Sequence, residues 1–133
     1  MKKVIVFGSF DPLHNGHLDF FRQAKKLGDF LTVVVARDEE IIARKKRSVR
    51  FMQDTRLKAV LNTGLADKVI LGDSVGKYSI LKKEEPDIIA IGYDQEIPQT
   101  LKDKLKQYRI ITLKPYKPEV FKSSKLLADT SKP

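Results

Sequence analysis

The sequence has no cysteine and no apolar stretch long enough to span a bilayer. Without cysteine, disulfides, thiolate metal ligands and cysteine nucleophiles are all excluded. A membrane helix needs about 20 consecutive apolar residues, whereas the apolar run near the start, residues 4–7, stops at a glycine. That short run favours a buried strand over a secretory signal. We therefore expect a cytoplasmic protein with no membrane partner.

Histidine is scarce and the charge is unbalanced. Only two histidines occur, and 26 Lys and Arg stand against 17 Asp and Glu, a net charge of +9. This excess indicates a polyanionic partner, either nucleic acid or a nucleoside triphosphate, or simply a basic solvated surface. A nucleic-acid-binding domain is the alternative to an enzyme, and we do not expect it. The lysines are scattered, and Phe20, Phe21 and Phe51 fall at apolar helix positions rather than on a stacking surface.

Apolar runs alternate with helical patterns along a chain that we expect to form a single domain, residues 1–133. Five runs predict buried strands, at residues 3–7, 30–36, 66–71, 87–91 and 109–113. Helical spacing predicts helices at residues 17–27, 48–61, 78–85, 98–107 and 123–128, with residues 37–50 as a loop or frayed helix. The alternation predicts an α/β fold, a Rossmann-like doubly wound five-stranded parallel sheet with helices on both faces. Ligands bind beyond the carboxyl ends of such strands.

The segment Gly8-Ser-Phe-Asp-Pro-Leu-His-Asn-Gly-His17 follows the first predicted strand and carries both histidines. A glycine at the strand end lets the backbone approach a ligand, and the following helix start offers free N–H groups to phosphate. His14 and His17, three residues apart, lie on one side of that helix start. Their imidazoles can donate to phosphate oxygens and to charge developing at phosphorus. A plain helix cap is the structural alternative, and two histidines alone make a poor zinc site.

This segment resembles the HxGH signature of the nucleotidylyltransferase superfamily. The resemblance implies transfer of a nucleotidyl group from an NTP to a phosphate-bearing acceptor, with Mg²⁺ and release of pyrophosphate, by a homodimer. Residues 34–39, 66–72 and 86–95 continue the likeness into the compact cytidylyltransferase and archaeal-type FAD synthase branch. Gly92-Tyr-Asp-Gln95 favours FMN adenylylation from ATP. Size and block order leave CTP-dependent glycerol-3-phosphate cytidylylation as the alternative.

The resemblance also assigns roles to single residues. Lys45 or Lys46 corresponds to the family's mobile lysine, and Arg56 to an arginine that faces the triphosphate. Asp11 either orients a helix-start amide or a Mg²⁺-bound water, or forms an Asx turn before Pro12. The predicted catalytic residues are His14, His17, Lys46 and Arg56. The predicted nucleotide-binding residues are Gly8, Ser9, Phe10, Asp11, Gly16, Gly92, Tyr93, Asp94, Ser123 and Ser124, and no metal ligand is directly predicted.

Two departures from the family pattern concern the tail. Archaeal FAD synthases often carry cysteine near the segment corresponding to residues 116–123, where this chain has none. The last predicted helix is also shorter than in many relatives. Both differences affect the expected acceptor pocket or dimer contact.

Overall fold

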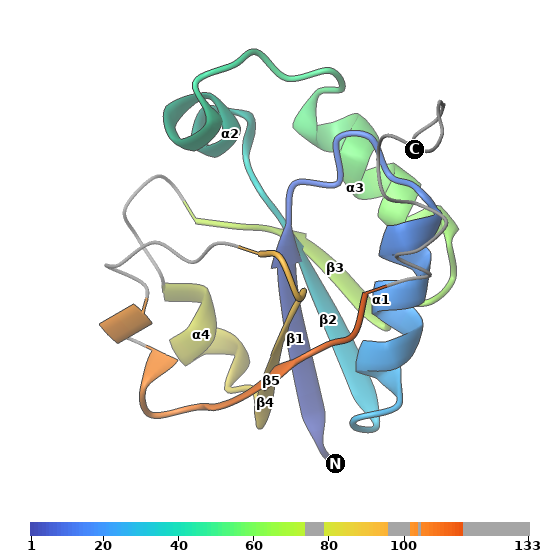
Figure 1. Ribbon diagram of the computed structural model, residues 1–133, viewed down its shortest axis with the longest axis vertical. Helices are drawn as coiled ribbons and strands as arrows, with labels where there is room; N and C mark the ends of the chain where they lie inside the picture. The colour runs from blue at the N-terminus through green and yellow to red at the C-terminus, as the bar shows by residue number, and fades with distance from the viewer. Residues whose placement is uncertain (74–78, 96–101, 104, 116–133) are drawn as a thin grey trace.

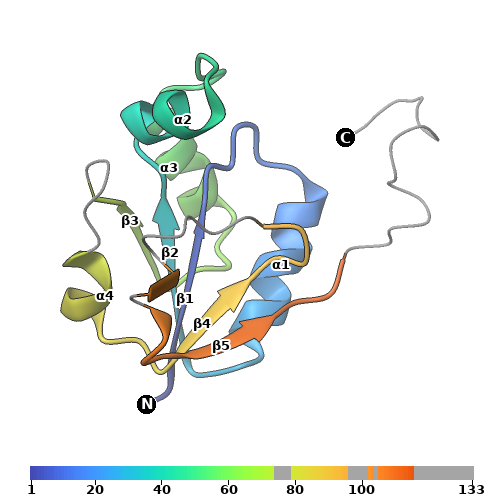
Figure 2. The same cartoon turned by 60° about the vertical axis from the view of Figure 1, so that its left-hand side comes forward.

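A computed structural model describes residues 1–73, 79–95, 102–103 and 105–115 (Figures 1 and 2). Its five strands form one sheet in the order β3-β2-β1-β4-β5, and every neighbouring pair is parallel. The predicted doubly wound Rossmann-like sheet is therefore confirmed. The strands are β1 Lys3–Gly8, β2 Phe30–Val35, β3 Lys68–Leu71, β4 Ile88–Ile91 and β5 Arg109–Thr112.

The helices match the prediction less closely at their ends. α1 (Asn15–Lys25) begins two residues before the expected start, because His14 caps it. The segment expected as a loop or frayed helix contains α2 (Asp38–Lys45), and α3 (Gln53–Asn62) begins five residues late. The fourth helix, α4, is Ser79–Glu84. Of the expected helix 98–107 only residues 102, 103 and 105 are described as helical, and the expected helix 123–128 lies outside the described residues.

α2 forms from a polar segment because its charges complement a helix dipole. Asp38, Glu39 and Glu40 occupy the first turn, and Arg44 and Lys45 the last. Each favourably placed charge contributes about 0.3–1 kcal/mol. Only Ile41 of this helix is buried. The segment therefore lacks the regular spacing of apolar residues from which a helix is predicted.

The two faces of the sheet are covered by different helices (Figure 1). Val4 and Val6 of β1 pack with α1 and α3, whereas Ile5 between them packs with Ile80 and Leu81 of α4. This alternation follows from the period of two in a strand. Burying each such side chain stabilises the fold by about 1.5–3 kcal/mol. No helix among the described residues is long and apolar enough to cross a membrane.

The strand order reverses between β1 and β4. From β1 the chain winds outward through β2 and β3, then crosses back to place β4 on the other side of β1. A crevice opens at the carboxyl edge of a sheet where the order reverses in this way. The loop after β1, the turn after β4 and the ends of β2 and β3 all meet at that edge.

Candidate active site

The loop between β1 and α1 is folded around Phe10. Its side chain is 3% exposed and its φ of 53° lies in the left-handed region. A Cβ on Gly8 would lie 2.5 Å from the Phe10 ring, so only glycine fits at the end of β1. The same ring meets His17 edge-on, with centroids 5.0 Å apart. Phe10 therefore packs against the His17 ring and helps to hold it in place.

The two histidines cap α1 and each other. The Nδ1 atom of His14 accepts the backbone N–H of Gly16 at 3.0 Å, and Nδ1 of His17 accepts the backbone N–H of His14 at 3.2 Å. A Cβ on Gly16 would lie 2.8 Å from the His14 ring, so a side chain there would displace that ring from its position. A neutral imidazole whose Nδ1 accepts must carry its proton on Nε2. Both rings thus offer an Nε2–H donor.

Electrostatics keep the pair neutral. Burial, reinforced by repulsion from Lys45 and from His14 when that ring is protonated, lowers the pKa of His17 to about 3. Burial also lowers the pKa of His14, against the opposing effect of the Asp94 carboxylate. At neutral pH both imidazoles therefore act as hydrogen-bond donors without carrying charge.

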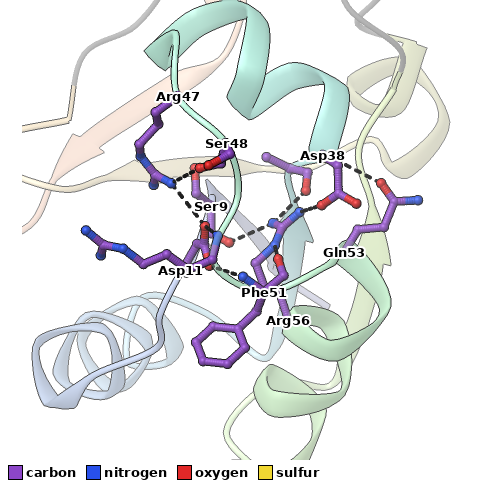
Figure 3. Close-up of polar contacts among 10 residues, drawn as sticks. Ser9, Asp11, Asp38, Arg47, Ser48, Phe51, Gln53 and Arg56 are labelled. Carbon is purple, nitrogen blue, oxygen red and sulfur yellow. Dashed lines mark hydrogen bonds and ion pairs between the residues drawn. The ribbon is translucent and has the colours of Figure 1, made fainter.

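Asp11 anchors a distant segment to this loop (Figure 3). Its carboxylate, in a residue that is 6% exposed, accepts the backbone N–H groups of Arg50 and Phe51, both at 2.8 Å, and Nη1 of Arg47 at 3.2 Å. Burial raises the pKa of Asp11, but these donors outweigh the effect of burial and hold the pKa below its ordinary value. The carboxylate therefore stays ionised, and its hydrogen bonds are made to protein groups. It also explains the late start of α3, because residues 50 and 51 are held outside the helix.

Arg56 joins three chain segments from inside the protein (Figure 3). Nε donates to the Phe51 carbonyl at 2.8 Å, and Nη1 donates to the carbonyls of Ser9 at 2.9 Å and Ala36 at 2.7 Å. Nη2 donates to Asp38 Oδ1 at 2.6 Å. The residue is 1% exposed. Four of the five N–H donors of the guanidinium are thus used by protein, so Arg56 positions the site instead of facing the triphosphate as predicted.

A cavity of about 930 Å³ occupies the carboxyl edge of the sheet. It brings most predicted site residues together, but Asp11, Lys46 and Arg56 do not line its described part, and Ser123 and Ser124 lie outside the described residues. Lys46 is the C-cap of α2 with a φ of 53°, whereas Lys45 lines the cavity. Burial, with the charges of Arg47 and Arg44, lowers the pKa of Lys45. The predicted residues that do line the cavity are Gly8, Ser9, Phe10, His14, Gly16, His17, Gly92, Tyr93 and Asp94.

Gln95 ends the Gly92-Tyr-Asp-Gln95 segment and lines the cavity, although it is not among the predicted site residues. Its Oε1 accepts the backbone N–H of Gly92 at 3.1 Å, and its Nε2 donates to the Phe7 carbonyl at 2.9 Å. β1 and β4 pair only from Val4 to Ile5, so Phe7 lacks a β4 partner there. The amide side chain fills that gap and fixes the turn that carries Asp94. The sequence carries no signal for this role, because it depends on where β1 and β4 diverge.

Carboxylates along the cavity are few and mostly engaged. Glu40 pairs with Arg44 at 3.3 Å, and Asp73 accepts the Ser79 hydroxyl and the Ile80 N–H at 2.8 and 2.9 Å. Within the described residues no group of three or more His, Asp or Glu side chains is placed to hold a metal ion.

Known proteins resemble this chain along most of its length. Residues 5–128 match the family described as cytidylyltransferase-like. The FAD synthase of Ferroglobus placidus is 39% identical over 108 residues, which cover 80% of this chain and 70% of that protein. The FAD synthase of Thermoplasma acidophilum is 41% identical over 122 residues, covering 87% and 84%. A lipopolysaccharide core biosynthesis protein from Thermoplasma volcanium has a similar crystal structure, with a TM-score of 0.78, 33% identity, and coverage of 87% and 98%.

Proposed function

The chain belongs to the cytidylyltransferase-like family of nucleotidyltransferases, and from that premise we propose that it transfers the adenylyl group of ATP to FMN. The relatives named FAD synthase support this choice of substrates. Glycerol-3-phosphate cytidylylation, the alternative acceptor reaction, shares the triphosphate chemistry and differs in what the rest of the cavity must hold.

The observation that carries the proposal is an apolar wall on one side of the cavity. The wall belongs to the sheet face covered by α4, away from the histidines' helix. A flavin ring needs a flat apolar slot, whereas glycerol phosphate needs only a compact polar one. The wall therefore favours FMN. We call this side the apolar half; it is lined by Phe7, Val34, Ile80, Leu81, Ile91 and Leu105.

The opposite, polar side suits the triphosphate of ATP. There the Nε2–H groups of His14 and His17 are available beside Lys45. An oxygen of the FMN phosphate forms the new bond to the α-phosphorus while the α–β bridging bond breaks, and pyrophosphate leaves with its electron pair. Donors aimed at this developing charge are the main source of catalysis in such transfers.

Neutral imidazoles fit this reaction because no proton has to move. The second pKa of a phosphate monoester is about 6, so the attacking oxygen is already ionised at neutral pH. Because Nδ1 of His17 accepts the His14 N–H, the proton of the neutral ring is on Nε2, and the lowered pKa of His17 keeps the ring neutral at pH 7. We assign both histidines to charge stabilisation and neither to general-base catalysis.

Mg²⁺ is expected to enter with ATP. This ion keeps several waters and is commonly held by substrate phosphates with one or two carboxylates. Because Glu40 and Asp73 are already engaged, the residues present fit a metal carried by the triphosphate, with Asp94 as the remaining cavity carboxylate. Bound there, Mg²⁺ would neutralise phosphate charge.

The family resemblance also supports a cytoplasmic homodimer. Sedimentation velocity on the purified chain tests the oligomeric state directly: a single species at twice the monomer mass is expected, and a monomer at micromolar concentration would contradict it.

The deciding experiment pairs ATP and CTP with FMN and glycerol 3-phosphate in all combinations. Pyrophosphate release and chromatography of the products are followed together. We expect FAD from ATP and FMN, and turnover at least tenfold slower in the other three mixtures. Formation of CDP-glycerol without FAD would replace the proposed function by the cytidylyl alternative.

A further inference from the structure

Arg37 lies at the edge of the apolar half and has no role in the reaction described so far. It follows Ala36, whose backbone N–H donates to the carbonyl of Gly8 at 2.9 Å. Its Nε donates to the carbonyl of Gly72 at 2.7 Å. The side chain therefore reaches from the end of β2 to the end of β3, and one edge of the guanidinium is fixed.

The other edge of this guanidinium is available. Among the described residues, neither Nη atom of Arg37 has a hydrogen-bond or ion-pair partner, and the residue lines the cavity while only half-buried. The other cavity arginine, Arg44, pairs with Glu40, and Arg56 is consumed by protein groups. Arg37 thus offers a pre-oriented fork of N–H donors to a ligand.

The fork is adjacent to the apolar half through Gly72. A Cβ on Gly72 would lie 3.3 Å from Val34 Cγ1, so the glycine packs directly on that wall. Asp73, the next residue, accepts the N–H of Ile80 and so places α4 beside it. An acceptor with its flat body on the wall therefore has a cation within reach at the carboxyl edge.

We propose that Arg37 binds the phosphate of the acceptor and makes the enzyme selective for a phosphorylated flavin. Arginine and phosphate match in a bidentate geometry that lysine cannot reproduce. Ala36, the residue before Arg37, bonds to Gly8 at the end of β1, and the guanidinium itself lies beyond it, where β2 and β3 end. Its charge offsets repulsion between the acceptor dianion and the triphosphate. The inference rests on the proposed function, because it takes FMN as the acceptor.

Binding of FMN and riboflavin, followed by flavin fluorescence, tests this directly, since riboflavin lacks the phosphate. We expect Arg37→Gln to weaken FMN binding by about 10- to 100-fold, the range for a charge-assisted hydrogen bond. Riboflavin and ATP binding should change less than about threefold on the same scale. Arg37→Lys keeps the charge without the fork and should give an intermediate loss for FMN. Arg22→Gln, an exposed arginine on α1 outside the cavity lining, is the matched control.

The outcomes separate this inference from the proposed function. If Arg37→Gln weakens FMN and riboflavin equally, Arg37 shapes the slot and does not read the phosphate, and the inference fails. Unchanged FMN binding in Arg37→Gln, with FAD still formed by the wild type, also overturns it while the proposed function stands. A wild type that neither binds FMN nor forms FAD overturns both.

Discussion

The rings of His14 and His17 stack with centroids 3.9 Å apart, and the Nδ1 atom of His17 accepts the backbone N–H of His14. Each imidazole therefore uses one nitrogen to build the helix start and leaves the other for the cavity. A glycine at position 16 lets the His14 ring keep this position, because the ring occupies the space of a side chain there. The spacing of the motif thus has a structural cause as well as a chemical one, and the two functions can be separated by substitution.

Replacing His17 with Asn removes the Nε2–H donor but keeps a short side chain with an acceptor near the His14 N–H. We expect kcat to fall about 100- to 1000-fold, because the lost donor acts most strongly on charge that develops in the transition state. ATP affinity, measured by calorimetry, should fall only a few-fold. His17→Ala should show the same split with an added loss of stability. Equal losses in binding and rate would contradict this role.

Stability should fall as the pH drops below neutrality, because the half-buried His17 is held neutral in the folded protein. In the unfolded chain it binds a proton near its ordinary pKa of 6.5, but in the folded protein only near 3. Between these values protons favour the unfolded state, by up to about 1.4 kcal/mol per pH unit. Urea unfolding at pH 7.5 and pH 5 should show a larger loss for the wild type than for His17→Asn. Parallel losses in the two proteins would contradict the neutral, half-buried state.

The Arg56 guanidinium should be essential for stability. Arg56→Met leaves Asp38 and three carbonyls without their donor, and breaking such a buried pair costs about 3–5 kcal/mol. Arg56→Lys keeps the charge but cannot reach all four acceptors, so we expect a smaller loss in urea unfolding. Arg50→Lys is the matched control, since Arg50 contributes its backbone N–H to Asp11 from an exposed position. A loss below about 1 kcal/mol for Arg56→Met would show that the network is dispensable.

The sequence predicted the parts of the fold that depend on local pattern. Each of the five strands is an apolar run, and burial on both faces of a parallel sheet demands such runs. The histidine loop was equally visible because its cap and donor roles lie within four residues. Asp11 and Arg56 were assigned to ligands, since their partners lie far along the chain: Asp11 binds residues 36 to 40 positions away, and Arg56 reaches Ser9 across 47. The periodic pattern of apolar residues in a short segment carries no information about contacts between residues so far apart in the chain.

The sequence also could not predict which lysine of the charged run lines the cavity. The choice between Lys45 and Lys46 depends on where α2 ends, and the left-handed Lys46 at that end turns the chain. Helix ends are set by tertiary contacts as much as by propensity. The same holds for Gln95, whose role depends on the divergence of β1 from β4.

Gln95→Glu should impair the site through the Phe7 carbonyl, which would then face a carboxylate oxygen in place of an amide N–H. We expect kcat/KM for ATP to fall about tenfold, in line with one unsatisfied buried polar group. The deficit should shrink as the pH falls toward 5, because a protonated carboxyl can donate again. Gln95→Met, which cannot titrate, is the control and should show no such recovery. Matching pH profiles for the two variants would contradict the hydrogen bond's role.

Lys45 and Lys46 provide a matched pair for testing which lysine meets the triphosphate. Lys45 lines the cavity beside His17, whereas Lys46 ends α2 in a left-handed turn. Lys45→Met should lower kcat/KM for ATP about 10- to 100-fold, because it removes a charge-assisted contact with phosphate. Lys46→Met alters the same net charge one residue away and should cost less than about threefold. A larger loss for Lys46→Met would show that α2 rearranges when ATP binds, and would return the catalytic role to Lys46.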